Sequence, residues 1–177
     1  IYASQLSGNL FPHLAVNEGQ EMPVGKAVLQ IIETPGHTSD AISVLISASG
    51  VADGKKFLLS GDSLFVGGIG RPDVMGEGYS AAELAGMMFA TWNEKLAQLP
   101  DSTVILPAHG AGCLCGIVLG DAPSSTIGKE KAENPFLKLA NNRNAFISAV
   151  ISGIEDAPAY FKENAALNRR GPELVDW

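Results

Sequence analysis

Short apolar runs separated by turn residues make up much of the first two thirds of the chain. Three of them, residues 26–34, 41–47 and 56–60, are rich in valine, isoleucine or leucine and are bounded by glycine, proline or serine. A fourth run, TVIL at 103–106, stops at Pro107. Runs of this length and composition are typical of buried β-strands. The pattern therefore predicts four strands, each ending in a turn.

The segment from Ser80 to Leu99 has helical periodicity instead. Its large apolar residues recur mostly at intervals of three or four positions, at Leu84, Met87, Met88, Trp92, Leu96 and Leu99. Ser80 followed three residues later by Glu83 is the signature of a capping box, and Pro100 cannot continue a helix. We expect a helix over residues 80–99 that ends at the proline.

Helical patterns with polar interruptions fill the chain beyond Gly120. One predicted helix opens at 134–135 and runs through Ile151, and another opens at 156–158 and fades near 169–172. Residues from about 121 to 177 are therefore expected to form a helical cap. No internal repeat or long linker divides the chain, so residues 1–177 are expected to belong to a single domain.

Composition and charge exclude several classes of protein. The 177 residues are 46% hydrophobic, enough for one substantial core, and the 20 glycines and 10 prolines are too many for a helical bundle. The formal charge is −7 without a dense basic patch, so nucleic acid is not an expected partner. No stretch approaches the roughly 20 apolar residues that span a bilayer, and residues 1–10 lack the features of a signal peptide. We expect a soluble, cytoplasmic protein that does not bind membranes.

Three residues of metal-ligand type each follow a predicted strand. His37 and His109 lie just past a strand and a turn, and Asp62 follows the strand at 56–60. Side chains on loops at neighbouring strand ends converge on one edge of a sheet, and two imidazoles with one carboxylate suit zinc or non-haem iron. The turn glycines beside them, Gly36, Gly61 and Gly110, are expected to let the backbone approach the site closely or to have a positive φ. From spacing alone, a metal site and a set of hydrogen-bonded loop residues remain equally open.

Three strings resemble the later metal-binding motifs of the metallo-β-lactamase superfamily, in its glyoxalase II-like branch. They are TPGHTSDAISVLI at 34–46, SGDSLFVGGIGRPD at 60–73 and ILPAHGAG at 105–112, in the family's order and spacing. More narrowly, the run at 68–73 and the strings at 109–116 and 123–128 are similar to persulfide dioxygenases and to bacterial lactamase–rhodanese fusion proteins. Residues 157–172 also resemble the end of the lactamase domain in those fusions.

The resemblance implies an α/β (α+β) fold, a four-layer αββα sandwich with a metal at one edge of its paired sheets. In the family's dinuclear hydrolases, His37 would bind the first metal, Asp62 would bridge both and His109 would bind the second. In its mononuclear iron dioxygenases, His37 and Asp62 would join one upstream histidine in a facial triad, and His109 would lie outside it. Asp62 and His109 are thus also expected to act in catalysis. Fe(II) is the expected cofactor, and Zn(II) is the alternative.

The family's T-H-x-H-x-D-H motif, which supplies further ligands, does not occur in the sequence. His13, in FPHLAVNEG, is expected to be a loop histidine rather than a substitute ligand. The resemblance therefore implies a sandwich truncated at its amino terminus, with at most three ligands from these residues and weak metal binding. Exposed strand edges would favour a homodimer.

Arg71, on the glycine-rich loop after Asp62, is a fixed cation suited to holding an anionic group of the substrate. A surface ion pair with Asp73 is the alternative. Cys115 resembles the cysteine that the bacterial fusions carry after HGAG. A thiolate near the site would there hold the sulfane sulfur of the substrate. Cys113 and Cys115 are too close in sequence for an ordinary disulfide, and Cys113 is expected to be a buried, inert thiol.

These likenesses favour a parent enzyme that oxidises a low-molecular-weight thiol persulfide to sulfite and thiol with mononuclear Fe(II). The alternative is a dinuclear zinc hydrolase of glyoxalase II type, which cleaves a thioester. A third interpretation is a non-catalytic structural or interaction domain beside a rhodanese domain in the same gene product.

Overall fold

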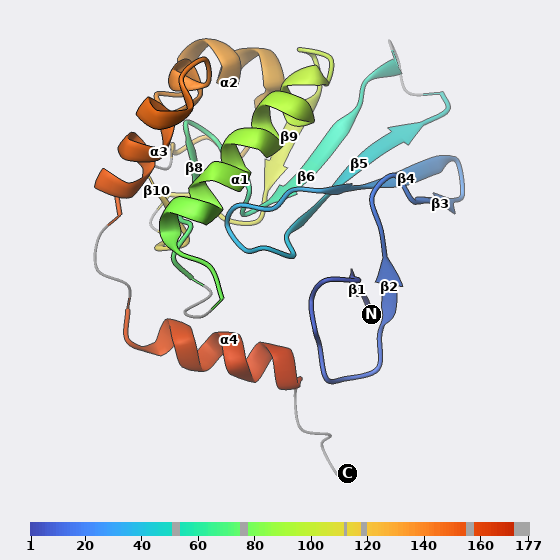
Figure 1. Cartoon of the computed structure of the whole chain (residues 1–177). Helices are drawn as coiled ribbons and strands as arrows, with labels where there is room; N and C mark the ends of the chain where they lie inside the picture. Colours follow the sequence, from blue (N-terminus) through green and yellow to red (C-terminus); the bar gives the residue numbers. More distant parts are fainter. Residues whose placement is uncertain (51–53, 75–77, 112, 118–119, 155–157, 172–177) are drawn as a thin grey trace.

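The main feature of the fold is a six-stranded sheet with strand order β11-β9-β6-β5-β4-β3 (Figure 1). The structure is a computed structural model that describes residues 1–50, 54–74, 78–111, 113–117, 120–154 and 158–171. The strands are Ser125–Thr126 (β11), Val104–Pro107 (β9), Phe57–Gly61 (β6), Ile42–Ala48 (β5), Ala27–Glu33 (β4) and Glu21–Val24 (β3). The four predicted strands are confirmed as β4, β5, β6 and β9, with small shifts in their bounds.

Strand direction brings three strand ends to one edge of this sheet. Neighbouring strands are antiparallel, except that β6 and β9 are parallel. The strands β4, β6 and β9 therefore all run the same way, and their carboxyl ends lie at the same edge. A parallel pair needs a long crossover, and the chain between β6 and β9 supplies it with a helix.

Both faces of the sheet are apolar. The face toward the helices carries four side chains of the main hydrophobic core, Ile32, Leu45, Leu58 and Ile105. On the opposite face, Leu59 is 41% exposed and pairs with Val44 across β5 and β6. A sheet that is apolar on both faces needs cover on both sides, as the inner layer of a sandwich does.

The first face is covered by α1 (Ala81–Glu94) together with α3 (Arg143–Ser152) (Figure 1). The predicted capping box is confirmed: the Glu83 N–H donates to Ser80 Oγ at 3.2 Å, and the Ser80 N–H donates to Glu83 Oε2 at 2.8 Å. The hydrogen bonds from Ser80 hold the pKa of the Glu83 carboxyl below its usual value. Phe89 of α1 and Phe146 of α3 meet edge to face, with ring centroids 5.6 Å apart.

Helix α1 is shorter than the predicted 80–99. The backbone of Lys95 leaves the helical conformation at φ −125°, and a 3-10 turn, η2 (Leu96–Gln98), follows. Lys95 instead turns toward the end of β4, where its ammonium donates to the Glu33 carbonyl oxygen at 2.7 Å. This contact between residues far apart in sequence explains why periodicity alone overestimated the helix.

The carboxy-terminal part differs in two places from the helical cap expected over about 121–177. Its first element, β11, is an edge strand of the sheet, and α2 (Ile127–Glu133) follows it. The predicted helix over 134–151 is divided into η3 (Leu137–Leu139) and α3, because Asn142 starts a new helix by accepting from the Ala145 N–H at 3.1 Å. The last helix is α4 (Tyr160–Arg170); its predicted opening at 156–157 and its end at 172 lie outside the described residues.

Two smaller sheets complete the part of the chain that the structure describes. One has the order β10-β8-β7, formed by Gly116–Ile117, Gly68–Gly70 and Leu64–Phe65. The other is the parallel pair of β1 (Tyr2–Ser4) and β2 (Leu14–Val16). The pairing of β8 with β10 joins the loop after Asp62 to the loop after His109. None of the described helices is both long and apolar enough to cross a membrane.

Candidate metal centre

His37, Asp62 and His109 lie together at the edge of the sheet where β4, β6 and β9 end. His37 lies in the turn between β4 and β5, Asp62 directly follows β6, and His109 follows β9. The Ala108 N–H donates to the Gly61 carbonyl oxygen at 3.2 Å and joins the last two loops. The parallel course of β4, β6 and β9 is therefore the reason that these three side chains meet.

Asp62 lies between the two histidines. Its Oδ2 is 3.4 Å from His37 Nε2, and its Oδ1 is 3.4 Å from His109 Nδ1. His109, whose ring stacks on Phe65 with centroids 6.5 Å apart, is the most exposed of the three. The third histidine of the chain, His13, is hydrogen-bonded to the Phe11 carbonyl oxygen at 2.8 Å, as expected of a loop histidine.

His37 is held in one orientation by the loop after β8. Its Nδ1 lies 2.8 Å from the backbone carbonyl oxygen of Arg71, and since a carbonyl can only accept, Nδ1 carries the proton. In the neutral imidazole, the other nitrogen, Nε2, is then unprotonated, and it faces Asp62. Burial lowers the pKa of His37, although the charge of Asp62 opposes this shift. A neutral imidazole that donates to a backbone carbonyl through its second nitrogen is the usual state of a metal ligand.

Asp62 has a carboxylate oxygen that accepts no hydrogen bond from the described residues. Among the described residues, its Oδ1 is buried and makes no hydrogen bond. A buried carboxylate oxygen that accepts no hydrogen bond costs free energy, so such an atom points to a bound cation or proton. Imidazole and carboxylate ligands suit both Zn(II) and Fe(II). The residues present therefore fit the metal that the sequence resemblance implies.

A buried network of hydroxyl groups supports the two loops. Ser63 Oγ lies 3.2 Å from the Thr34 carbonyl oxygen and 2.9 Å from Thr34 Oγ1. Thr34 Oγ1 lies 3.0 Å from Ser43 Oγ, which donates to the Ser60 carbonyl oxygen at 3.2 Å. The network ties the end of β4 to the loop after β6. Sequence reasoning missed it, although the hydroxyl residues in ETPGH and SGDS, at both strand ends, were the signal.

Gly70 lets the backbone of β8 approach the site closely. A Cβ atom at this position would collide with the Asp62 carbonyl oxygen and would lie 3.0 Å from His37 Nδ1. Any side chain here would therefore displace one of the two candidate ligands. Sequence reasoning also missed this residue, which lies inside the resembling G-x-G-R-x-D run.

Two of the three turn glycines have the expected geometry. Gly36 has φ 153° and packs against Met88 of α1, and Gly61 has φ 55°. The expectation was wrong for Gly110, which has no positive φ and nothing within 4 Å of its Cβ position. The loop after β9 is therefore open at this point and does not need a glycine for space.

Arg71 is buried and paired with Asp73. Its Nε and Nη2 donate to Asp73 Oδ1 and Oδ2 at 2.6 Å and 2.7 Å, and the arginine side chain is 5% exposed. The guanidinium also lies over the ring of Phe161 in α4, 5.4 Å from its centroid. The ion pair considered from the sequence is thus present, but it is not at the surface. A role of Arg71 in holding the substrate stays a prediction.

Cys113 and Cys115 lie in the loop between β9 and β10, and both are free and half-buried. Each has its sulfur within 4.8 Å of the other and of an imidazole nitrogen of His109. Cys113 was expected to be a buried, inert thiol; the expected burial was wrong, because the residue is only half-buried, and its inertness stays a prediction. Burial and the hydrogen bond with Cys113 raise the pKa of Cys115 to about 12. A sulfur carrier reacts as a thiolate. The carrier role of Cys115 therefore stays a prediction.

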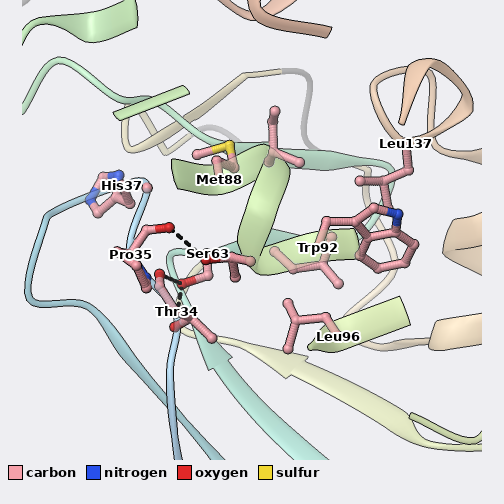
Figure 2. Close-up of a pocket in the computed structure, with 12 residues that line it drawn as sticks. Thr34, Pro35, His37, Ser63, Met88, Trp92, Leu96 and Leu137 are labelled. Carbon is pink, nitrogen blue, oxygen red and sulfur yellow. Dashed lines mark hydrogen bonds between the residues drawn. The ribbon is translucent and has the colours of Figure 1, made fainter. Parts of the chain in front are cut away.

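A small cavity lies behind His37. Figure 2 shows His37 at one end of it, Trp92 and Leu137 at the other and Met88 between them. Its volume is about 10 Å³, room for roughly one water molecule. The turn that carries His37 is closed on this side by α1, where Thr91 Oγ1 donates to the Pro35 carbonyl oxygen at 2.7 Å. This cavity is a gap in packing and not a substrate site.

A larger cavity has a volume of about 330 Å³. Arg71, Cys113, Leu114 and Phe136 are among its lining residues. Its volume is within the range of small-molecule sites, at the low end of roughly 300–1,000 Å³.

Two solved structures resemble the chain over nearly its whole length. A metallo-β-lactamase from Staphylococcus aureus matches with a TM-score of 0.85 and 34% identity, over 99% of this chain and 52% of the other. The chain belongs to the metallo-β-lactamase fold family. The second structure, ETHE1 from Myxococcus xanthus, matches the present chain with a TM-score of 0.72 and 28% identity, over 95% of this chain and 64% of ETHE1.

Curated relatives include a probable metallo-hydrolase of Bacillus subtilis, which is 30% identical over 125 residues, or 71% of this chain and 47% of that protein. A hydroxyacylglutathione hydrolase of Yersinia enterocolitica is 33% identical over 109 residues, which are 62% of this chain and 37% of that protein. The chain spans about half the length of the first curated relatives that it matches. A scan against models of protein families finds no match. The comparisons confirm the expected family and fold class, and its hydrolase members imply a metal cofactor.

Proposed function

We propose that the chain is part of a persulfide dioxygenase that oxidises a low-molecular-weight thiol persulfide with mononuclear Fe(II). The likeness to ETHE1 carries this proposal, because it extends over 95% of the chain with 28% identity. ETHE1 belongs to the persulfide dioxygenases, which the strings around Arg71 and Cys115 also resemble. The reaction would consume one O₂ and one water per persulfide and release sulfite, thiol and two protons.

His37 and Asp62 are the proposed iron ligands of this chain. The Arg71 carbonyl fixes the imidazole of His37, and the hydrogen bonds of Ser63 to Thr34 fix the distance between the two loops. When bound, the iron would supply the positions at which O₂ and the substrate sulfur react. The resemblance implies one further histidine ligand, which is not among these residues. His109 would lie beside these ligands, with its Nδ1 3.4 Å from Asp62 Oδ1.

The cavity of about 330 Å³ is the proposed place for the organic part of the substrate. Leu114 and Phe136 would provide apolar contacts, and Arg71 would provide positive charge. Because Arg71 already pairs with Asp73, a substrate carboxylate would bind at the edge of an ion pair rather than to a free cation. A cavity of this size suits a small thiol.

Oxygen uptake tests the proposal. The full encoded protein, loaded with iron, should consume O₂ and form sulfite from glutathione persulfide, and it should not cleave a glutathione thioester. Asp62→Asn should abolish the activity, whereas Glu83→Gln, in the exposed first turn of α1, should leave it unchanged. Thioester cleavage without oxygen uptake would overturn the proposal.

One observation favours the alternative, a dinuclear zinc hydrolase. The two oxygens of Asp62 face two different histidines, as those of a carboxylate that bridges two metals would. His109 would then be a ligand, and His109→Ala would lower the zinc content of the encoded protein. In the dioxygenase, the same substitution would leave the iron content unchanged.

A further inference from the structure

His109, Cys113 and Cys115 form a cluster of donor atoms beside the candidate metal centre. One imidazole nitrogen and the two sulfur atoms all lie within 4.8 Å of one another. A single cation placed among them would need only small side-chain movements to reach each atom, because metal–sulfur and metal–nitrogen bonds are about 2.0–2.3 Å long. His109 is exposed and both cysteines are half-buried, so a cation from solvent can enter.

The loop holds these donors through contacts that do not involve His37 or Asp62. The Cys115 N–H donates to Cys113 Sγ at 3.2 Å, and the Cys113 N–H donates to the Gly110 carbonyl oxygen at 3.3 Å. The Cys115 carbonyl oxygen accepts from the Arg71 N–H at 3.1 Å, which fixes the loop to β8. The two sulfurs are therefore prearranged on one side of His109.

The chemistry of the donors differs from that of the first site. Two sulfurs and one imidazole select soft cations, whereas the pair of His37 and Asp62 offers nitrogen and oxygen. We propose that His109, Cys113 and Cys115 form a second metal site, which binds a soft d10 cation, Cu(I) or Zn(II), through one nitrogen and two sulfurs. Binding displaces the two thiol protons to solvent, and no oxidation takes place. Three donors complete a site for Cu(I), while Zn(II) would add a water molecule.

This site goes beyond the proposed dioxygenase and shares only His109 with the alternative hydrolase. In the dioxygenase, His109 is not an iron ligand, so both sites can be filled at once. In the hydrolase, the two cations would compete for the same imidazole. Whether His109 also binds a metal of the first site therefore decides whether the second site can be filled in the dioxygenase or must compete in the hydrolase.

Anaerobic titration of the reduced chain with Cu(I) and, separately, with Zn(II), each against a chromophoric competitor, tests the site. A free-thiol count first establishes that both cysteines are reduced. Co(II) serves as a spectroscopic substitute for Zn(II), since sulfur-to-cobalt absorption reports how many thiolates bind. We expect one cation per chain, with an absorption that halves in Cys113→Ser and in Cys115→Ser.

Variants separate this site from the candidate iron site. Cys113→Ser, Cys115→Ser and His109→Ala should each weaken binding of the soft cation by about tenfold or more. Asp62→Asn should leave that binding unchanged while it weakens binding of Fe(II). Circular dichroism checks that each variant is folded. If Cys113→Ser does not fold, Cys113→Ala is used in its place. Binding that is insensitive to Cys113 and Cys115, or equally sensitive to Asp62, would overturn the second site without affecting the proposed dioxygenase.

Discussion

The Nδ1 atom of His37 lies 2.8 Å from the backbone carbonyl oxygen of Arg71, so the loop after β8 decides which nitrogen of His37 faces Asp62. The same residue binds the Cys115 carbonyl oxygen through its own N–H at 3.1 Å. Arg71 thus joins the loop of His37 to the loop of the two cysteines through its backbone. The position of this loop is therefore central to the site, whatever the Arg71 side chain does.

Gly70→Ala should weaken metal binding. The new methyl group would collide with the Asp62 carbonyl oxygen and crowd His37 Nδ1, so both candidate ligands would shift. Loss of the contacts that orient a metal ligand typically lowers metal affinity about 10–100-fold. We expect a change of that order in the Fe(II) affinity measured by titration. Gly110→Ala is the matched control, since that position is open and has no positive φ. Equal affinities of the two variants would show that the close approach of β8 is unimportant.

Arg71→Gln should raise KM for the persulfide more than it lowers kcat in the full encoded protein. An interaction made equally with the substrate and the transition state acts on KM. Asp73→Asn is the control, because it removes the negative charge that faces the guanidinium while it keeps Arg71, and it should not raise KM. If Arg71 serves only the buried pair, both variants will instead lower the thermal midpoint and leave KM unchanged.

Cys115→Ser should impair turnover in the full encoded protein, whereas Cys113→Ser should not. The reason is the predicted role of Cys115 as a carrier of sulfane sulfur, which a serine cannot perform. Steady-state rates with glutathione persulfide provide the measurement. Equal and negligible effects of the two substitutions would end the carrier hypothesis, although they would leave the proposed second metal site in place.

The Cys115 thiol should react slowly with iodoacetamide at alkaline pH. Burial and Cys113 raise its pKa from 9.0 to about 12, so the folded chain keeps a proton that the unfolded chain loses. This proton contributes stability below pH 9, and the contribution is lost as the pH rises from there toward about 12. Alkylation followed by mass spectrometry at several pH values measures the reactivity. Rapid alkylation of Cys115 at pH 8 in the folded chain would contradict the raised pKa.

Local sequence patterns were sufficient to predict four strands of the main sheet, β4, β5, β6 and β9, and the three residues at strand ends, but not β3 and β11. Each predicted strand is a contiguous apolar run, and its turn residues mark where it stops. The capping box at Ser80 was equally local, because both of its members lie within one helical turn. The meeting of His37, Asp62 and His109 then follows from strands that run in the same direction.

Contacts between distant residues were not predictable in this way. The hydrogen bond of Ser63 to Thr34 and the approach of Gly70 to Asp62 depend on how β4, β6 and β8 pack. The burial of Arg71 depends on Phe161, which is far along the chain in α4. No spacing rule connects such pairs, and only the tertiary structure brings them together.

The central claim, that His37 and Asp62 hold the metal, is tested most directly by the Fe(II) dissociation constant of the 177-residue chain under anaerobic conditions. We predict weak binding that Asp62→Asn and His37→Ala each reduce further, by about tenfold or more, since a lost ligand costs more than lost support. His13→Ala, which removes a loop histidine, should not change the constant. Tight, near-stoichiometric iron that survives both Asp62→Asn and His37→Ala would contradict the account.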